Sequence, residues 1–239
     1  MVELQNLLIL QLIAHVISDF YCQNDEISKR KKDRGFKTWY LYGHALLTFL
    51  IAWLFSYSFD FVIYALVIGC THLLIDGIKS LVKNWKYVFF ADQMVHIVVI
   101  GMVVSFYNHR VGISLPEWIP YTRYLLLISG VIICLKPTNI LISNVFKSFD
   151  ISTTDTTGKT GELEKAGRLI GNLERVLALV LVLLNQYQAI GFLIAAKAIL
   201  RFKDTSTAKT EYVLIGTLLS FGVAILIGVF IMKIKTIVQ

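Results

Sequence analysis

Apolar stretches long enough to cross a membrane recur along the whole of this sequence. They fall at roughly 4–21, 38–56, 59–81, 88–107, 121–146, 167–186, 188–202 and 211–233. A bilayer core about 30 Å thick is crossed by a helix of about 20 apolar residues. Only 16% of the residues are charged, too few to cover the surface of a soluble domain. We therefore predict an all-α, polytopic membrane bundle of about eight transmembrane helices.

The distribution of Lys and Arg sets the predicted orientation of these helices. Sixteen of the 23 Lys and Arg residues lie at one set of helix ends: Lys29, Arg30, Lys31, Lys32, Arg34, Lys37, Lys79, Lys83, Lys86, Lys147, Lys159, Lys165, Arg168, Arg201, Lys203 and Lys209. The opposite ends carry Arg110, Arg123, Lys233 and Lys235. By the positive-inside rule, the basic loops lie in the cytoplasm and both termini lie outside.

This asymmetry also accounts for the formal net charge of +7. We therefore expect the lipid bilayer, and not nucleic acid, to be the main partner of the chain. The sequence leaves the oligomeric state open.

The chain is predicted to have four parts. Residues 1–107 form a four-helix membrane bundle, and 108–147 an interfacial loop followed by a helix broken at Pro137. A polar stretch at 148–166 is a cytoplasmic linker, and 167–239 contain the C-terminal membrane helices.

Histidine and aspartate residues recur where the first four helices meet the cytoplasm. They include four of the five histidines of the chain: His15, Asp19, His44, His72, Asp76, Asp92 and His96. Since successive helices run in opposite directions, this topology brings the seven side chains to one depth. Three pairs are spaced i,i+4, so each pair shares one helix face.

Such polar groups are costly inside hydrocarbon and need partners or a function. Imidazole and carboxylate together are the usual ligands of zinc, iron or manganese. Ligands contributed by several helices of a bundle core are typical of carboxylate-bridged dimetal sites. We predict that the seven residues bind one or two divalent ions (Zn, Mn or Fe), with Asp19 or Asp92 as an alternative general base. Interhelical hydrogen bonding and a proton relay are the other interpretations.

A second group of charged residues lies in the second half of the chain. Together with Lys79, these residues are candidates for binding an anionic substrate: Lys136, Arg168, Glu174, Arg175, Lys197 and Arg201. Alternatively, Glu174 and Glu211 neutralise the neighbouring cationic side chains, and the Arg201 side chain extends to the membrane–water interface.

The order of these motifs resembles a known family. The segments AHVISDFYCQ, GHALLTF, THLLIDGIK and DQMVHI resemble a bacterial integral-membrane family, domain of unknown function 3307. The segments GRLIGNLERVL, AIGFLIAAKAILRF and EYVLIGTLLSF resemble the second half of its longer members. The resemblance implies a location in the bacterial inner membrane and no particular activity. The first half is more distantly similar to membrane-bound metal-dependent hydrolases, although it lacks their H-x-x-x-x-D-H type of cluster.

Three functions are consistent with these features. The first is a metal-dependent hydrolase embedded in the membrane, open to the cytoplasmic leaflet and acting on a phosphate-bearing lipid or a nucleotide-like substrate. The second is a transporter or channel for a cation or a proton-coupled solute. The third is a sensor or scaffold in which the metal is structural.

Overall fold

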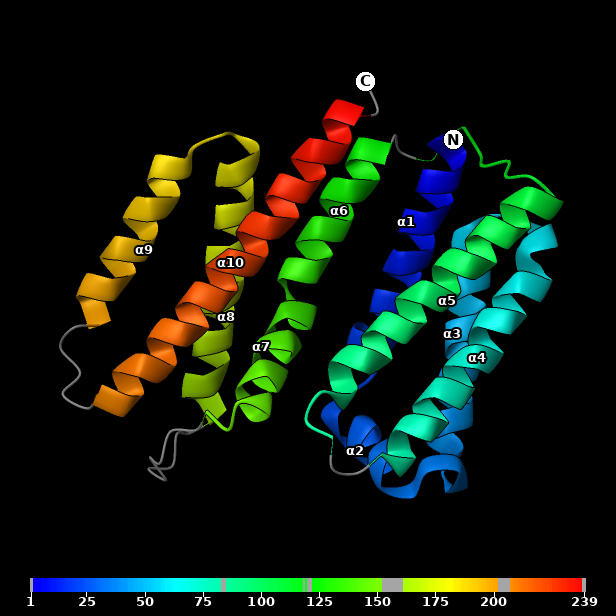
Figure 1. Ribbon diagram of the computed structural model, residues 1–239, viewed down its shortest axis with the longest axis horizontal. Helices are drawn as coiled ribbons and strands as arrows, with labels where there is room; N and C mark the ends of the chain where they lie inside the picture. The colour runs from blue at the N-terminus through cyan, green and yellow to red at the C-terminus, as the bar shows by residue number, and fades with distance from the viewer. Residues whose placement is uncertain are drawn as a thin grey trace. The chain divides into compact units, whose positions relative to one another are not determined.

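The computed structural model of the chain describes residues 2–82, 85–117, 119, 122–151, 161–201 and 207–237. Every regular element within these ranges is helical, which confirms the all-α prediction. The chain forms two compact units, Met1–Leu126 and Leu127–Gln239. They are described separately below as the first and the second unit (Figure 1).

The first unit is a bundle of four long helices with one short helix at its end. The helices are α1 (Val2–Val16), α2 (Asp25–Arg34), α3 (Trp39–Ser56), α4 (Val62–Leu81) and α5 (Val88–Arg110). Helices α1 and α4 each pack against both α3 and α5, so the four long helices close a ring around a shared interior. Helix α2 lies at one end of this bundle and the N-terminus lies at the other (Figure 1).

The four long helices of the first unit have the length and composition of membrane spans. Each of the segments Val2–Tyr21, Trp39–Ser56, Phe59–Leu81 and Val88–Arg110 is at least 18 residues long, with a mean hydropathy of 1.2 to 2.0. Large apolar side chains such as Leu54 are exposed on the outside of the bundle, whereas polar residues are buried in one half of the interior. A soluble bundle has the reverse arrangement. The chain is therefore a membrane protein.

Helices α3 and α4 approach closely at a glycine. A Cβ atom at Gly69 would lie 2.8 Å from Cβ of Phe49 and 3.2 Å from the carbonyl oxygen of Ala45. Small residues allow helices to pack closely in membranes, where van der Waals contact contributes much of the association energy.

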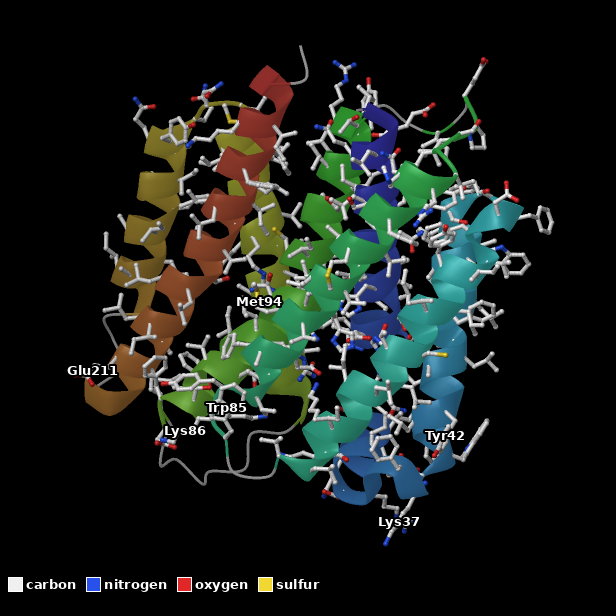
Figure 2. The ribbon with its side chains drawn as sticks, turned by 45° about the vertical axis from the view of Figure 1, so that its right-hand side comes forward. Lys37, Tyr42, Trp85, Lys86, Met94 and Glu211 are labelled. Atoms are coloured by element: carbon white, nitrogen blue, oxygen red, sulfur yellow. The ribbon has the colours of Figure 1, made fainter. Side chains whose placement is uncertain are left out.

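Helix α2 is stabilised at both ends by its own sequence. At its start, the Asn24 side chain accepts a hydrogen bond from the backbone N–H of Ile27 at 2.8 Å. At its end, Gly35 has φ +52°, and a Cβ at this position would lie 2.3 Å from Oγ of Ser80 on α4. The glycine thus ends α2 and allows the chain to dock on α4. Lys37 and Tyr42 lie at this same end of the unit (Figure 2).

The second unit contains the remaining helices. They are α6 (Thr122–Cys134), which begins in the first unit, α7 (Lys136–Ser148), α8 (Gly161–Leu183), α9 (Tyr187–Arg201) and α10 (Thr207–Ile237). Helix α8 packs against α9 and α10, and α7 packs against α10. The segment Glu211–Ile234 of α10 has the composition of a membrane span, with a mean hydropathy of 2.6.

The predicted break before Pro137 is present. Helix α6 ends at Cys134, α7 begins at Lys136, and the two helices bend by 47° at this point. Proline lacks the N–H needed to continue a helix but suits its first turn, which explains why α7 starts here. If α6 and α7 form one bent span, the described residues contain six candidate spans.

The structure differs from the expected boundaries in two places. Helix α8 starts at Gly161, inside the stretch predicted as a linker, because Glu, Leu, Lys and Ala in GELEKAG favour helix. The basic segment after the first span was expected to be a loop and instead forms α2. Residues 111–117 form the non-helical connection expected after α5, while Trp118 and Tyr121 lie outside the described residues.

Candidate metal centre

All seven predicted metal ligands lie within the first unit and project into the interior of the four-helix ring. His15 is near the end of α1, and Asp19 lies in a π-helical turn, Ile17–Tyr21, that continues α1. The other five come from α3, α4 and α5: His44, His72, Asp76, Asp92 and His96. Six of the residues are at most 8% exposed, and the Asp19 side chain is 10% exposed.

The Asp19 carboxylate lies closer to two other helices than to its i,i+4 neighbour His15. The distance from Nδ1 of His15 to Oδ1 of Asp19 is 3.9 Å. The same Oδ1 lies 3.2 Å from Nε2 of His44 and 3.2 Å from Nε2 of His72. Single π-helical turns within α-helices are frequent at functional sites.

Three donor atoms from three helices form a compact triangle. The Nε2 atoms of His44 and His72 are 2.9 Å apart, and each is 3.2 Å from Oδ1 of Asp19. Oδ2 of Asp76 lies 3.9 Å from Nε2 of His44 and 3.7 Å from Nε2 of His72. The four atoms are called the primary donor set below.

These separations match the edges of a coordination polyhedron. With metal–ligand bonds of about 2.0–2.1 Å, the ligands of a tetrahedral ion lie about 3.3 Å apart. The three sides of the triangle are close to this value, and the Asp76 oxygen is slightly farther away. Two imidazoles and two carboxylates are also a suitable ligand set for zinc, iron or manganese.

Several buried polar atoms beside the triangle have no hydrogen-bond partner in the structure. They are Nδ1 and Nε2 of His15, Nδ1 of His72, Oδ1 of Asp92 and Nε2 of His96. The ring centroids of His15 and His96 are 5.0 Å apart, and those of His72 and His96 are 4.2 Å apart. Buried polar atoms are nearly always satisfied in proteins, so this concentration favours a ligand.

Two lysines neutralise carboxylates of the cluster. Nζ of Lys79 lies 2.5 Å from Oδ2 of Asp92, and Nζ of Lys31 lies 2.5 Å from Oδ2 of Asp76. Lys79 was predicted to bind substrate. The sequence identifies Lys31 only as one of the basic residues that set the topology, but the side chain is buried and belongs to the site.

Lys31 reaches the site because α2 docks on the end of α4. A sequence signal for this helix exists, since Asn24 and Gly35 cap the intervening residues. Which face of α2 turns toward Asp76 depends on the docking and is not visible in the sequence.

Neutral side chains complete the polar interior. Nε2 of Gln93 donates to Oδ2 of Asp92 at 3.1 Å and to Oδ2 of Asp19 at 3.4 Å. Oγ of Ser18 and Oγ1 of Thr48 form a 2.6 Å hydrogen bond. Gln93 thus links the two carboxylates that were predicted as alternative general bases.

The charged residues of the second unit form separate interactions. Lys197 of α9 pairs with Glu174 of α8, as the neutralising interpretation predicts for these two residues. Arg168 is exposed, Lys136 begins α7, and the Arg201 side chain lies outside the described residues. The Glu174–Lys197 pair joins α8 to α9.

Arg175 is only 2% exposed, and its guanidinium donates to neutral oxygens. The Nε–H donates to the carbonyl of Cys134 at 2.5 Å, where the proline break frees backbone acceptors. The remaining bonds reach the side-chain oxygens of Ser220, Asn139 and Asn172. Arg175 therefore fastens the broken helix α6–α7 to α8 and α10.

The fold and site define a helical membrane protein with a buried His/Asp cluster at one end of a four-helix bundle. The family described as protein of unknown function (DUF3307) matches residues 7–126, and the chain belongs to this family. The matched region contains all seven clustered residues and nearly coincides with the first unit. Comparisons with curated proteins and with solved structures found no match.

Proposed function

We propose that the protein is a membrane-embedded, divalent-metal-dependent hydrolase. The observation that carries the proposal is the primary donor set, in which three ligand atoms from three helices lie 2.9–3.2 Å apart. The hydrogen bonds among these atoms leave buried nitrogens of the neighbouring His15 and His96 without a partner, which supports a bound cation.

A divalent ion in the primary donor set would supply an activated water and stabilise negative charge on the substrate. The residues around it have separate roles. Asp92, or Asp19 through the Oδ2 that is not in the primary donor set, would accept the proton from the water, and Gln93 would orient both carboxylates. Neutral imidazoles with Nε2 free are needed at His44 and His72, because only that form binds a metal.

The charge balance favours an anionic substrate. The ammonium groups of Lys31 and Lys79 pair with the carboxylates of Asp76 and Asp92. The Asp19 carboxylate, which faces His44, leaves one negative charge uncompensated. One divalent ion would change this to one net positive charge. A buried positive charge attracts an anion, and a phosphate group of a lipid or of a nucleotide-like molecule fits that requirement.

The proposed orientation follows from the basic residues. Helix α2, with Lys29, Arg30, Lys32 and Arg34, lies at the same end of the first unit as the site, because its Lys31 pairs with Asp76. We place this end in the cytoplasm of a bacterium, in the inner membrane, with both termini outside. The total is about eight transmembrane spans if α6 and α7 form one span and if α8 and α9 each cross the membrane. The Lys79 side chain, 35% exposed, would then face the cytoplasmic leaflet.

Transport of a cation or a proton-coupled solute is the second candidate. Buried Gln11 and Thr48, one helical turn beyond His15 and His44, extend the polar lining away from the cytoplasmic end of the bundle. Against transport, the other half of the interior is filled by a tightly packed apolar core. That core consists of Leu7, Ala52, Phe61, Ala65, Ile68, Ile100, Val104 and Tyr107. A sensor or scaffold with a structural metal is the third candidate.

The first experiment is elemental analysis of detergent-purified protein beside a His72→Ala/Asp76→Ala variant. We expect one or two tightly held ions in the wild type and their loss in the variant. Hydrolysis of phosphate monoesters, phosphodiesters and lipid phosphates is then assayed with the loaded protein. Folded wild-type protein that takes up no zinc, manganese or iron would rule out the hydrolase and direct the work to flux measurements in proteoliposomes.

A further inference from the structure

Asp76 belongs to two groups of converging donor atoms. The first contains His44 and His72, and the second contains Asp92 and His96; in each group the ligand atoms lie within 4.8 Å of one another. We propose that a second divalent ion binds between Asp76, Asp92 and His96, with Asp76 bridging it to the ion of the primary donor set. This inference rests on the proposed function.

The hydrogen bond of His96 prepares its ring for metal binding. Nδ1 lies 2.8 Å from the backbone carbonyl of Asp92, and because a carbonyl oxygen only accepts, Nδ1 carries the proton. Nε2 therefore has a free lone pair, and it is buried without a partner. Metal-binding histidines typically donate their other N–H to a carbonyl or carboxylate in this way.

Asp92 offers the second free donor. Its Oδ1 is buried without a hydrogen-bond partner, while Oδ2 is engaged by Lys79 and Gln93. The residue is 5% exposed and His96 is 3% exposed, so neither unpartnered atom is satisfied by bulk water. A cation between them satisfies both.

The two lysines occupy positions that suit a cation. Nζ of Lys79 and Nζ of Lys31 each lie 2.5 Å from a carboxylate oxygen of the proposed second site. Lys79 therefore competes with the second ion for Asp92, and its partly exposed side chain can move away when the ion binds. The ammonium group released in this way lies beside the ions, where it can contact an anionic substrate.

The second site is expected to bind its ion less tightly than the primary site and to prefer harder metal ions. It offers two carboxylates and one imidazole, a set that suits Mn²⁺ or Fe²⁺ more than the primary set does. Once Asp92 is a ligand, the role of general base falls to Oδ2 of Asp19, which accepts a hydrogen bond from Gln93 at 3.4 Å, while Oδ1 belongs to the primary donor set.

The test uses the full-length protein titrated with Mn²⁺ and followed by elemental analysis and electron paramagnetic resonance. We expect two bound ions about 3.5–4 Å apart, giving an exchange-coupled spectrum. Asp92→Asn and, independently, His96→Gln should each retain one ion with the spectrum of isolated Mn²⁺. The matched control is His109→Gln, which changes the exposed histidine of α5 and should behave as wild type.

The outcomes separate this inference from the proposed function. If the wild type binds one ion and both variants keep it, the second site is overturned and the primary site stands. If the folded wild type binds no ion, both proposals fail together.

A lysine variant tests the competition directly. Lys79→Met should bind the second Mn²⁺ at least tenfold more tightly than wild type, whereas Lys32→Met, which changes an exposed lysine of α2, should not differ. Equal or weaker binding of the second ion by Lys79→Met would overturn the role assigned to this ammonium group.

Discussion

Replacing His44 by alanine tests the primary donor set most directly. Nε2 of this residue forms two sides of the donor triangle, 2.9 Å from His72 and 3.2 Å from Asp19, so the change removes one of four ligands. Four-ligand zinc sites bind with about 10–16 kcal/mol, or about 2.5–4 kcal/mol for each ligand. At 1.4 kcal/mol for each factor of ten, His44→Ala should weaken zinc binding about 10²- to 10³-fold.

The assay is competition for Zn²⁺ between the detergent-purified protein and a fluorescent chelator. His109→Ala is the matched control, because His109 is exposed at the end of α5 and lies outside the cluster. Its affinity for Zn²⁺ should equal that of the wild type. The reasoning is refuted if folded His44→Ala retains wild-type affinity, or if both alanine variants lose affinity to the same extent.

Three further substitutions test packing and charge by unfolding in detergent. Lys31→Met leaves the Asp76 carboxylate buried without its cation and should lower the unfolding free energy of metal-free protein by about 3–5 kcal/mol. A divalent ion should restore part of this loss. Arg175→Leu leaves buried acceptors unsatisfied and should cost about 3 kcal/mol or more. Gly69→Ala should cost about 1–3 kcal/mol by overpacking, whereas Gly101→Ala has free space and should not destabilise.

Each substitution has a control that distinguishes loss of the specific interaction from a non-specific loss of stability. Lys32→Met removes an exposed charge from the same helix as Lys31 and should change stability by about 0.5 kcal/mol or less. Arg175→Lys keeps the charge but not the planar set of donors, so most of the loss should remain. Wild-type stability of Arg175→Lys would contradict the role given to the guanidinium, and equal effects at the two glycines would contradict close packing at Gly69.

Much of the candidate site was visible in the sequence because helix geometry is regular. His72 and Asp76 are four residues apart on one helix, so they share a face whatever the helix packs against. The contacts of Asp19 were not predictable in this way, because its carboxylate lies nearest to His44 and His72 of two other helices and its own backbone forms a π-helical turn. No local pattern in ISDFY indicates that turn.

The sequence by itself determined that the chain is an all-helical membrane protein, where its first four spans lie, and that Pro137 interrupts a helix. These properties depend on local quantities: the apolar length needed to cross hydrocarbon and the missing N–H of proline. Only the tertiary structure decided which donor atoms meet. The triangle requires α1, α3 and α4 to adopt particular rotations, and the Lys31–Asp76 pair joins residues 45 positions apart through the docking of α2 on α4. Such contacts depend on the packing of every helix against its neighbours, and a single helix does not specify them.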